Sequence, residues 1–114
     1  MKIFRQGDVI LIQRKAAPEG GELAKDARGV VLAEGETSGH HHQVFGKGAK
    51  LFNYKATSAR FLHVPTTGAE VRVDGGEVNG VPRHTPILLG KGMYEIRIQR
   101  SWDSERAASE RVAD

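Results

Sequence analysis

Three consecutive histidines at positions 40–42 are the residues of this chain whose type and spacing best suit chemistry. Successive side chains of an extended strand point to opposite faces, so His40 and His42 would share one face and His41 would point away from them. Two imidazoles at this spacing can chelate one divalent metal ion. The pattern therefore predicts a metal site built on His40 and His42, with His41 tolerant of replacement.

A metal site needs at least a third ligand, usually from another strand. His84 is the best candidate because it precedes an apolar run, and His63 is the second candidate. Glu36 and Glu34, just before the histidines, could serve as a ligand, as a hydrogen-bond partner of a ligand or as a general base. The alternative is that residues 40–42 form an exposed strand edge and that His84 caps a turn, with no metal bound.

Short β-strands are expected to position these residues. Fourteen glycines divide the chain into brief apolar or alternating runs, and helical periodicity is nearly absent before the C-terminal end. The predicted strands cover residues 2–5, 9–13, 30–33, 40–45, 50–54, 60–64, 69–74, 87–89 and 93–102. Eight or nine such strands in one chain predict an all-β fold, a small barrel or a jelly-roll sandwich, because closing or doubling the sheet removes exposed edges.

The last strand has the clearest alternation. Its pattern predicts that Tyr94, Ile96 and Ile98 are buried while the residues between them face water or a partner. Residues 16–28 are expected to form an exposed loop, with one helical turn at residues 22–26. The chain would thus comprise one β-domain over residues 1–102 and a tail, residues 103–114, that could form a short helix.

The amino-acid composition excludes several classes of function. The chain has 114 residues, 27% of them charged, and no cysteine, which excludes a disulfide framework, a zinc ribbon and a thiol nucleophile. Its formal net charge is +3, but the basic residues are scattered rather than clustered, so nucleic-acid binding is not expected. The start of the chain shows no signal-peptide or membrane-spanning pattern, and a cytoplasmic bacterial or phage protein is expected.

Several segments together resemble small uncharacterised bacterial β-proteins. These proteins share a Gln-Gly-Asp-Val start, a Gly-His-x-His element and a Tyr-Glu-Ile/Val-x-x-Gln-Arg end, found here at residues 6–9, 39–42 and 94–100. The chain is also distantly similar to cupins, although cupins carry a glutamate a few residues after His-x-His and this chain does not. The resemblance implies that His40, His42 and His84 act as a set, and it implies no specific activity.

Two functions are consistent with these observations. The first is a cupin-like β-domain that binds a divalent metal through His40, His42 and His84. The second is a non-enzymatic subunit that assembles with copies of itself, of the phage or ring-forming kind. A homo-oligomer is expected in either case, because a small domain with many short strands has few ways to protect its sheet edges, and the C-terminal tail could contribute to the contact.

Overall fold

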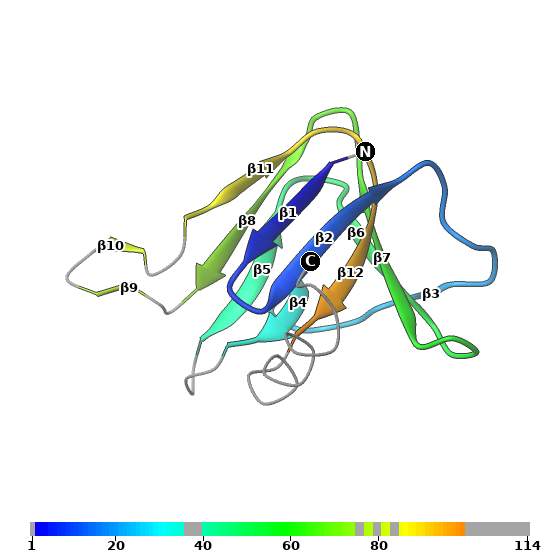
Figure 1. Ribbon diagram of the computed structural model, residues 1–114, viewed down its shortest axis with the longest axis horizontal. Coiled ribbons are helices and arrows are strands. Elements are labelled where there is room, and N and C mark those ends of the chain that lie inside the picture. Colours follow the sequence, from blue (N-terminus) through cyan, green and yellow to red (C-terminus); the bar gives the residue numbers. More distant parts are fainter. Residues whose placement is uncertain (1, 36–39, 75–76, 79–80, 83–84, 100–114) are drawn as a thin grey trace, which may run out of the picture.

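The computed structural model describes residues 2–35, 40–74, 77–78, 81–82 and 85–99 of the chain. These residues form two antiparallel sheets and a small hairpin (Figure 1). The strands are β1 (Ile3–Gln6), β2 (Val9–Arg14), β3 (Glu22–Leu23), β4 (Val30–Glu34), β5 (His41–Phe45), β6 (Lys50–Tyr54), β7 (Ala59–Val64), β8 (Ala69–Asp74), β9 (Glu77–Val78), β10 (Val81–Pro82), β11 (Ile87–Leu89) and β12 (Gly92–Ile98). The predicted all-β class is confirmed, as a two-sheet arrangement rather than a closed barrel.

The larger sheet has six strands in the order β1-β2-β12-β7-β6-β3, and the smaller has four in the order β11-β8-β5-β4. Strands β9 and β10 pair only with each other. In the six-stranded sheet the longest strand, β12, pairs with both β2 and β7. Strand β5, which carries the histidines, pairs with β4 on one side and β8 on the other.

The hydrophobic core draws on both sheets, and alternation decides which residues enter it. In β12, Tyr94 and Ile96 are buried, as predicted, whereas Ile98, which was predicted to be buried, is partly buried and packs against the core. Glu95 and Arg97 occupy the other face, where Glu95 accepts hydrogen bonds from Arg14 and Arg97. Burial alone would raise the pKa of Glu95, but these two guanidinium groups outweigh it and the pKa is lowered.

The prediction of a helical turn at residues 22–26 was wrong. Glu22 and Leu23 form β3, which pairs with β6, and the next amide, Ala24 N, donates to Leu51 O at 2.8 Å. Both β3 side chains are exposed, so backbone pairing rather than burial holds this strand. A strand of that kind leaves no hydrophobic pattern from which it could be predicted.

The end of the chain lies outside the described residues from position 100 onward. This applies to the last three residues of the predicted strand 93–102 and to the predicted tail helix. Strand β12 ends at Ile98, and Gln99 N then donates to Asp8 O at 2.9 Å. Among the described residues no helix is long and apolar enough to cross a membrane.

Candidate functional site

Strand β5 is an interior strand of the four-stranded sheet, and both of its faces are covered. The exposed fractions of His41, His42 and Gln43 are 7%, 4% and 9%, although all three side chains are polar. The alternative that these histidines form an exposed strand edge is therefore wrong. Buried polar groups need hydrogen-bond partners, and each of these residues has one.

His42 points toward the core and meets a glutamine from the other sheet. Its Nδ1 lies 2.9 Å from Oε1 of Gln6, a residue of β1 that is itself almost completely buried. The amide nitrogen of Gln6 donates to the backbone oxygens of Val71 and Thr85, both at 3.0 Å. Gln6 thus joins β1 to β8, to the segment before β11 and to the histidine of β5.

His40 lies immediately before β5 and is half-buried. Its backbone oxygen accepts a hydrogen bond from Gly35 N at 2.7 Å, which extends the pairing of β4 with β5 by one step. A Cβ on Gly35 would come within 2.8 Å of the His40 Cβ, so only glycine leaves room for His40 at this point.

His63 does not join this group. Its neighbours Leu62 and Val64 are fully buried in the core, so alternation places His63 on the outer face of the six-stranded sheet. In the pairing register it lies beside Met93 and Lys50. The structure therefore does not bring His63 together with His42, which faces the core from the opposite sheet.

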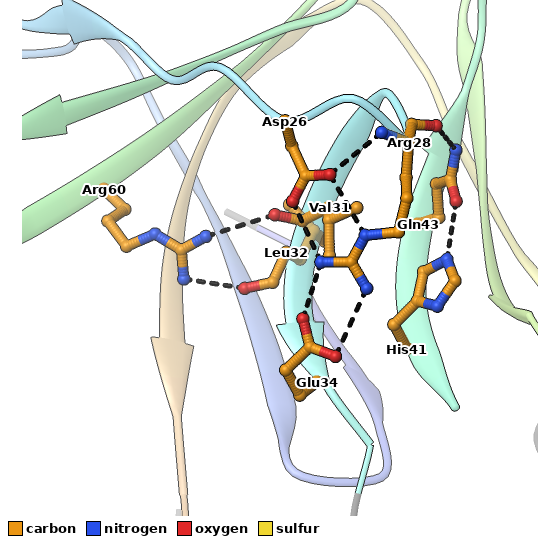
Figure 2. A network of polar contacts seen from close by, with 8 residues as sticks. All are labelled: Asp26, Arg28, Val31, Leu32, Glu34, His41, Gln43 and Arg60. Carbon is orange, nitrogen blue, oxygen red and sulfur yellow. Dashed lines mark hydrogen bonds and ion pairs between the residues drawn. The ribbon is translucent and has the colours of Figure 1, made fainter. Parts of the chain in front are cut away.

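His41 takes part in a second network (Figure 2). Because successive side chains of a strand point to opposite faces, this network lies on the face of β5 opposite to His42. The Nε2 of His41 lies 2.7 Å from Oε1 of Gln43, and the Gln43 amide nitrogen donates to Arg28 O at 2.6 Å. The Arg28 side chain forms ion pairs with Asp26 at 2.9 Å and Glu34 at 2.7 Å. These contacts hold the connection between β3 and β4 against the face of β5 that carries His41.

The ion pairs of this network shift its pKa values. Hydrogen bonds from Arg28 lower the pKa of Asp26 from 3.8 to about 2 and also lower the pKa of Glu34, while the two carboxylates raise the pKa of Arg28. Glu34, a candidate ligand or base in the sequence, is thus already engaged in an ion pair.

Gly29 allows the β3–β4 connection to approach β5. Its φ of +119° is unfavourable for residues with a side chain, and a Cβ there would lie 2.9 Å from the amide nitrogen of Gln43. On the other side of β4, Arg60 of β7 donates to Leu32 O at 2.7 Å and Val31 O at 3.4 Å, next to a break in the β4–β5 register (Figure 2). Desolvation lowers the pKa of this half-buried guanidinium.

Two predicted ligands lie outside the described residues: Glu36 in the gap at 36–39, and His84 in the gap at 83–84. The described part of the chain contains no group of three or more His, Cys, Asp or Glu residues arranged to hold a metal. A site with three such ligands that includes His42 would need at least one ligand from outside the described residues. Thr85, the residue directly after His84, is held by Gln6.

Gln6 and Gln43 were not predicted as site residues from the sequence. Gln6 does belong to the Gln-Gly-Asp-Val motif, but nothing in the sequence assigns that glutamine to a histidine 36 positions away. Gln43 follows the histidines directly, and its spacing of two from His41 is the one available signal, since such residues share a face.

The comparisons with known proteins give a family without an assigned activity. Neither the curated proteins nor the solved structures contain a match to this chain. One family model matches residues 5–99, which include both glutamine–histidine pairs and most of the described strands. The chain therefore belongs to the family described as Domain of unknown function (DUF8820).

Proposed function

We propose that this protein binds one divalent metal ion through His40, His42 and His84, in a cupin-like β-domain. Glu36 is an alternative ligand or a hydrogen-bond partner of one. The observation that carries the proposal is the buried imidazole of His42, whose Nδ1 is hydrogen-bonded to an immobilised amide oxygen. Metal-binding histidines almost always donate their second ring N–H to an acceptor such as a carboxylate, a backbone carbonyl or water, and the Gln6 oxygen can serve in the same way.

The arrangement of the neighbouring segments supports the other two ligands. Gln6 is hydrogen-bonded to His42 and to Thr85, the residue that follows His84 in the sequence. His40 is held on the other side by the hydrogen bond from Gly35. The described residues Thr85 and His40 are thus each held by a hydrogen bond, and Thr85 shares its partner Gln6 with His42.

The ligand set suggests the type of metal and of chemistry. Three imidazoles suit zinc, iron, copper or nickel better than magnesium or calcium, which prefer oxygen ligands. A site with three protein ligands keeps an open position, where a metal lowers the pKa of a bound water molecule or takes up a small ligand such as dioxygen.

Metal content tests the proposal directly. Protein purified without a histidine tag should contain about one equivalent of a transition metal by elemental analysis, or bind one after chelator treatment. The variants His42→Ala and His84→Ala should each lose the stoichiometric metal. His63→Ala is the matched control and should retain it, because His63 lies on the outer face of the other sheet. Wild-type protein that neither contains nor takes up metal would refute the proposal.

A second candidate function is self-assembly, and one feature of the outer face of the six-stranded sheet favours it. The pairing registers align one residue from every strand of this sheet in a single row across that face. The row consists of Ile3, Ile12, Glu95, Phe61, Phe52 and Leu23. Ile3 and Leu23, at its two ends, are 62% and 50% exposed. Five of these six residues are apolar, although Ile12 and Phe61 are buried and Glu95 is charged, so the two exposed ends of the row are the parts that suit contact with a second copy of the chain.

Sedimentation analysis at several concentrations tests this second candidate. The wild-type protein should associate, and Ile3→Glu should weaken the association because it places a charge in the apolar row. Lys50→Glu is the matched control, a charge change on an exposed residue outside this row. Truncation after Trp102 shows whether the tail contributes to the contact. A wild-type protein that remains monomeric at all concentrations would rule out the assembly function, without affecting the metal proposal.

A further inference from the structure

We infer that Gln6 is the positioning residue of the proposed metal site: it keeps the proton of His42 on Nδ1, so that Nε2 is the nitrogen that binds the metal. This inference rests on the proposed function for the metal, but the orientation of His42 follows from the hydrogen bonds alone. It adds to the site a residue from the opposite sheet.

The donors and acceptors of the Gln6 amide determine which of its atoms faces His42. Its NH₂ group has two hydrogens and no acceptor capacity, and it faces two backbone oxygens, Val71 O and Thr85 O. The amide therefore cannot be flipped without placing its oxygen against two other oxygens. The Gln6 oxygen must face His42, where it can only accept. His42 Nδ1 consequently carries the proton, and in the neutral ring the lone pair lies on Nε2.

In the neighbouring pair, His41 and Gln43, the proton lies on the other nitrogen of the imidazole ring. Gln43 donates from its amide nitrogen to Arg28 O, so its oxygen accepts from Nε2 of His41. His41 thus carries its proton on Nε2, and it lies on the other face of β5. Two adjacent histidines are held in opposite tautomers by two buried glutamines, and only His42 is oriented from across the core by a residue that also holds the segment after His84.

Gln6 could instead be a purely structural residue that satisfies buried polar groups. The two roles differ in what they predict. A structural role predicts that replacement lowers stability alone, whereas a positioning role predicts that it changes the His42 tautomer and the metal affinity. Gln43 provides the matched comparison, because it is also a buried glutamine bonded to a histidine and a backbone oxygen.

The first measurement uses the metal-free wild-type protein. Long-range ¹H–¹⁵N spectra of the imidazole rings distinguish a protonated from an unprotonated ring nitrogen, and the His42 signals are assigned by their loss in His42→Ala. We expect His42 with its proton on Nδ1 and His41 with its proton on Nε2. A His42 ring with its proton on Nε2 would overturn the inference, whether or not the protein binds metal.

The second measurement compares zinc binding by calorimetry in wild type, Gln6→Met, Gln6→Glu and Gln43→Met. Replacing the partner of a ligating histidine typically lowers metal affinity about 10- to 100-fold, which is the expected effect of Gln6→Met. Gln6→Glu keeps an acceptor for the Nδ1 proton but places its second carboxylate oxygen against Val71 O and Thr85 O, so it should be less stable than wild type and, where it folds, should restore most of the affinity. Gln43→Met should bind zinc like wild type. Unchanged affinity in Gln6→Met would overturn the inference.

The two proposals can fail separately. If wild type shows the expected tautomer but binds no metal, the metal function is refuted while Gln6 remains the group that orients His42. If metal binds and Gln6→Met binds it equally well, the function stands and the positioning role is refuted. If Gln6→Met does not fold, the tautomer of His42 in the wild-type protein still decides the question.

Discussion

At the scale of single residues, the main feature of this protein is the use of neutral amides to satisfy buried imidazoles. A glutamine can donate from its amide nitrogen and accept at its amide oxygen, so a backbone oxygen next to the nitrogen leaves the amide oxygen to face the imidazole, and the ring nitrogen that it meets must carry the proton. Gln6 and Gln43 both work in this way. An unpaired polar group in the same place would cost the full desolvation of that group.

The hydrogen bond to Gln43 changes the expectation for His41, which the sequence alone suggested could be replaced freely. His41→Ala should lower the free energy of unfolding by about 1–3 kcal/mol, because it leaves the buried Gln43 oxygen without its partner. The measurement is urea denaturation, with Lys50→Ala as an exposed control that should change stability by less than about 0.5 kcal/mol. A loss in His41→Ala as small as in the control would show that the hydrogen bond to Gln43 contributes nothing.

At the scale of elements, the strands divide into those held by burial and those held by other contacts. Strand β12 lies between β2 and β7 and sends alternate side chains into the core. Strand β3 is held by backbone pairing, and the β3–β4 connection by the ion pairs of Arg28. The stability contributed by elements held by burial should fall when apolar side-chain volume is removed. The stability contributed by elements held by ion pairs should depend on pH and salt concentration.

Ile96→Ala tests the first kind of element. Ile96 is 5% exposed within the core, so this truncation should lower the free energy of unfolding by about 2–5 kcal/mol. Arg97→Ala, one position along the same strand and exposed, should cost less than about 1 kcal/mol. Chemical denaturation of both variants provides the measurement, and equal losses would mean that the two faces of β12 are not distinguished as described.

The Arg28 ion pairs predict a pH dependence. The pKa of Asp26 is about 2 in the folded protein against an ordinary value of 3.8, so the folded state binds this proton less readily than the unfolded state. The resulting stabilisation is present above the ordinary value and is lost as the pH falls through the folded value. Arg28→Met should flatten the stability profile in this window, when unfolding is followed from neutral pH to pH about 2. Stability profiles of the variant and the wild type that superimpose over this pH range would contradict this prediction.

At the scale of the whole molecule, the candidate site lies between the two sheets. Gln6 belongs to the six-stranded sheet and His42 to the four-stranded sheet, and their hydrogen bond crosses the core. Arg60 makes a second polar link between the sheets through the backbone oxygens of β4. A ligand bound at His42 should therefore stabilise the complete fold rather than one local segment.

Metal binding should accordingly raise the free energy of global unfolding. At a free metal concentration about 100 times the dissociation constant, the expected gain is about 2.7 kcal/mol, and chelation should remove it. The gain should be absent in His42→Ala and retained in His63→Ala, as measured by denaturation with and without metal. Stabilisation by metal that persists in His42→Ala would place the binding site elsewhere.

The sequence by itself determined the features that depend on the extended backbone alone. The all-β class, the buried and exposed faces of β12, and the opposite orientations of His41 and His42 all follow from side chains that alternate along a strand. Most strand positions could be predicted because apolar runs alternate with glycine-rich turns. Strand β3 could not, because it carries no buried side chain.

Only the tertiary structure decided which strands meet. It covered both faces of β5, placed His63 on the far side of the other sheet, and brought Gln6 to His42 across 36 positions of sequence. The physical reason is that alternation is a property of one strand, whereas burial and hydrogen-bond partners depend on pairing and packing between segments distant in the chain. The chemistry open to His42 depends on those distant contacts, because its tautomer is set by a residue from the opposite sheet.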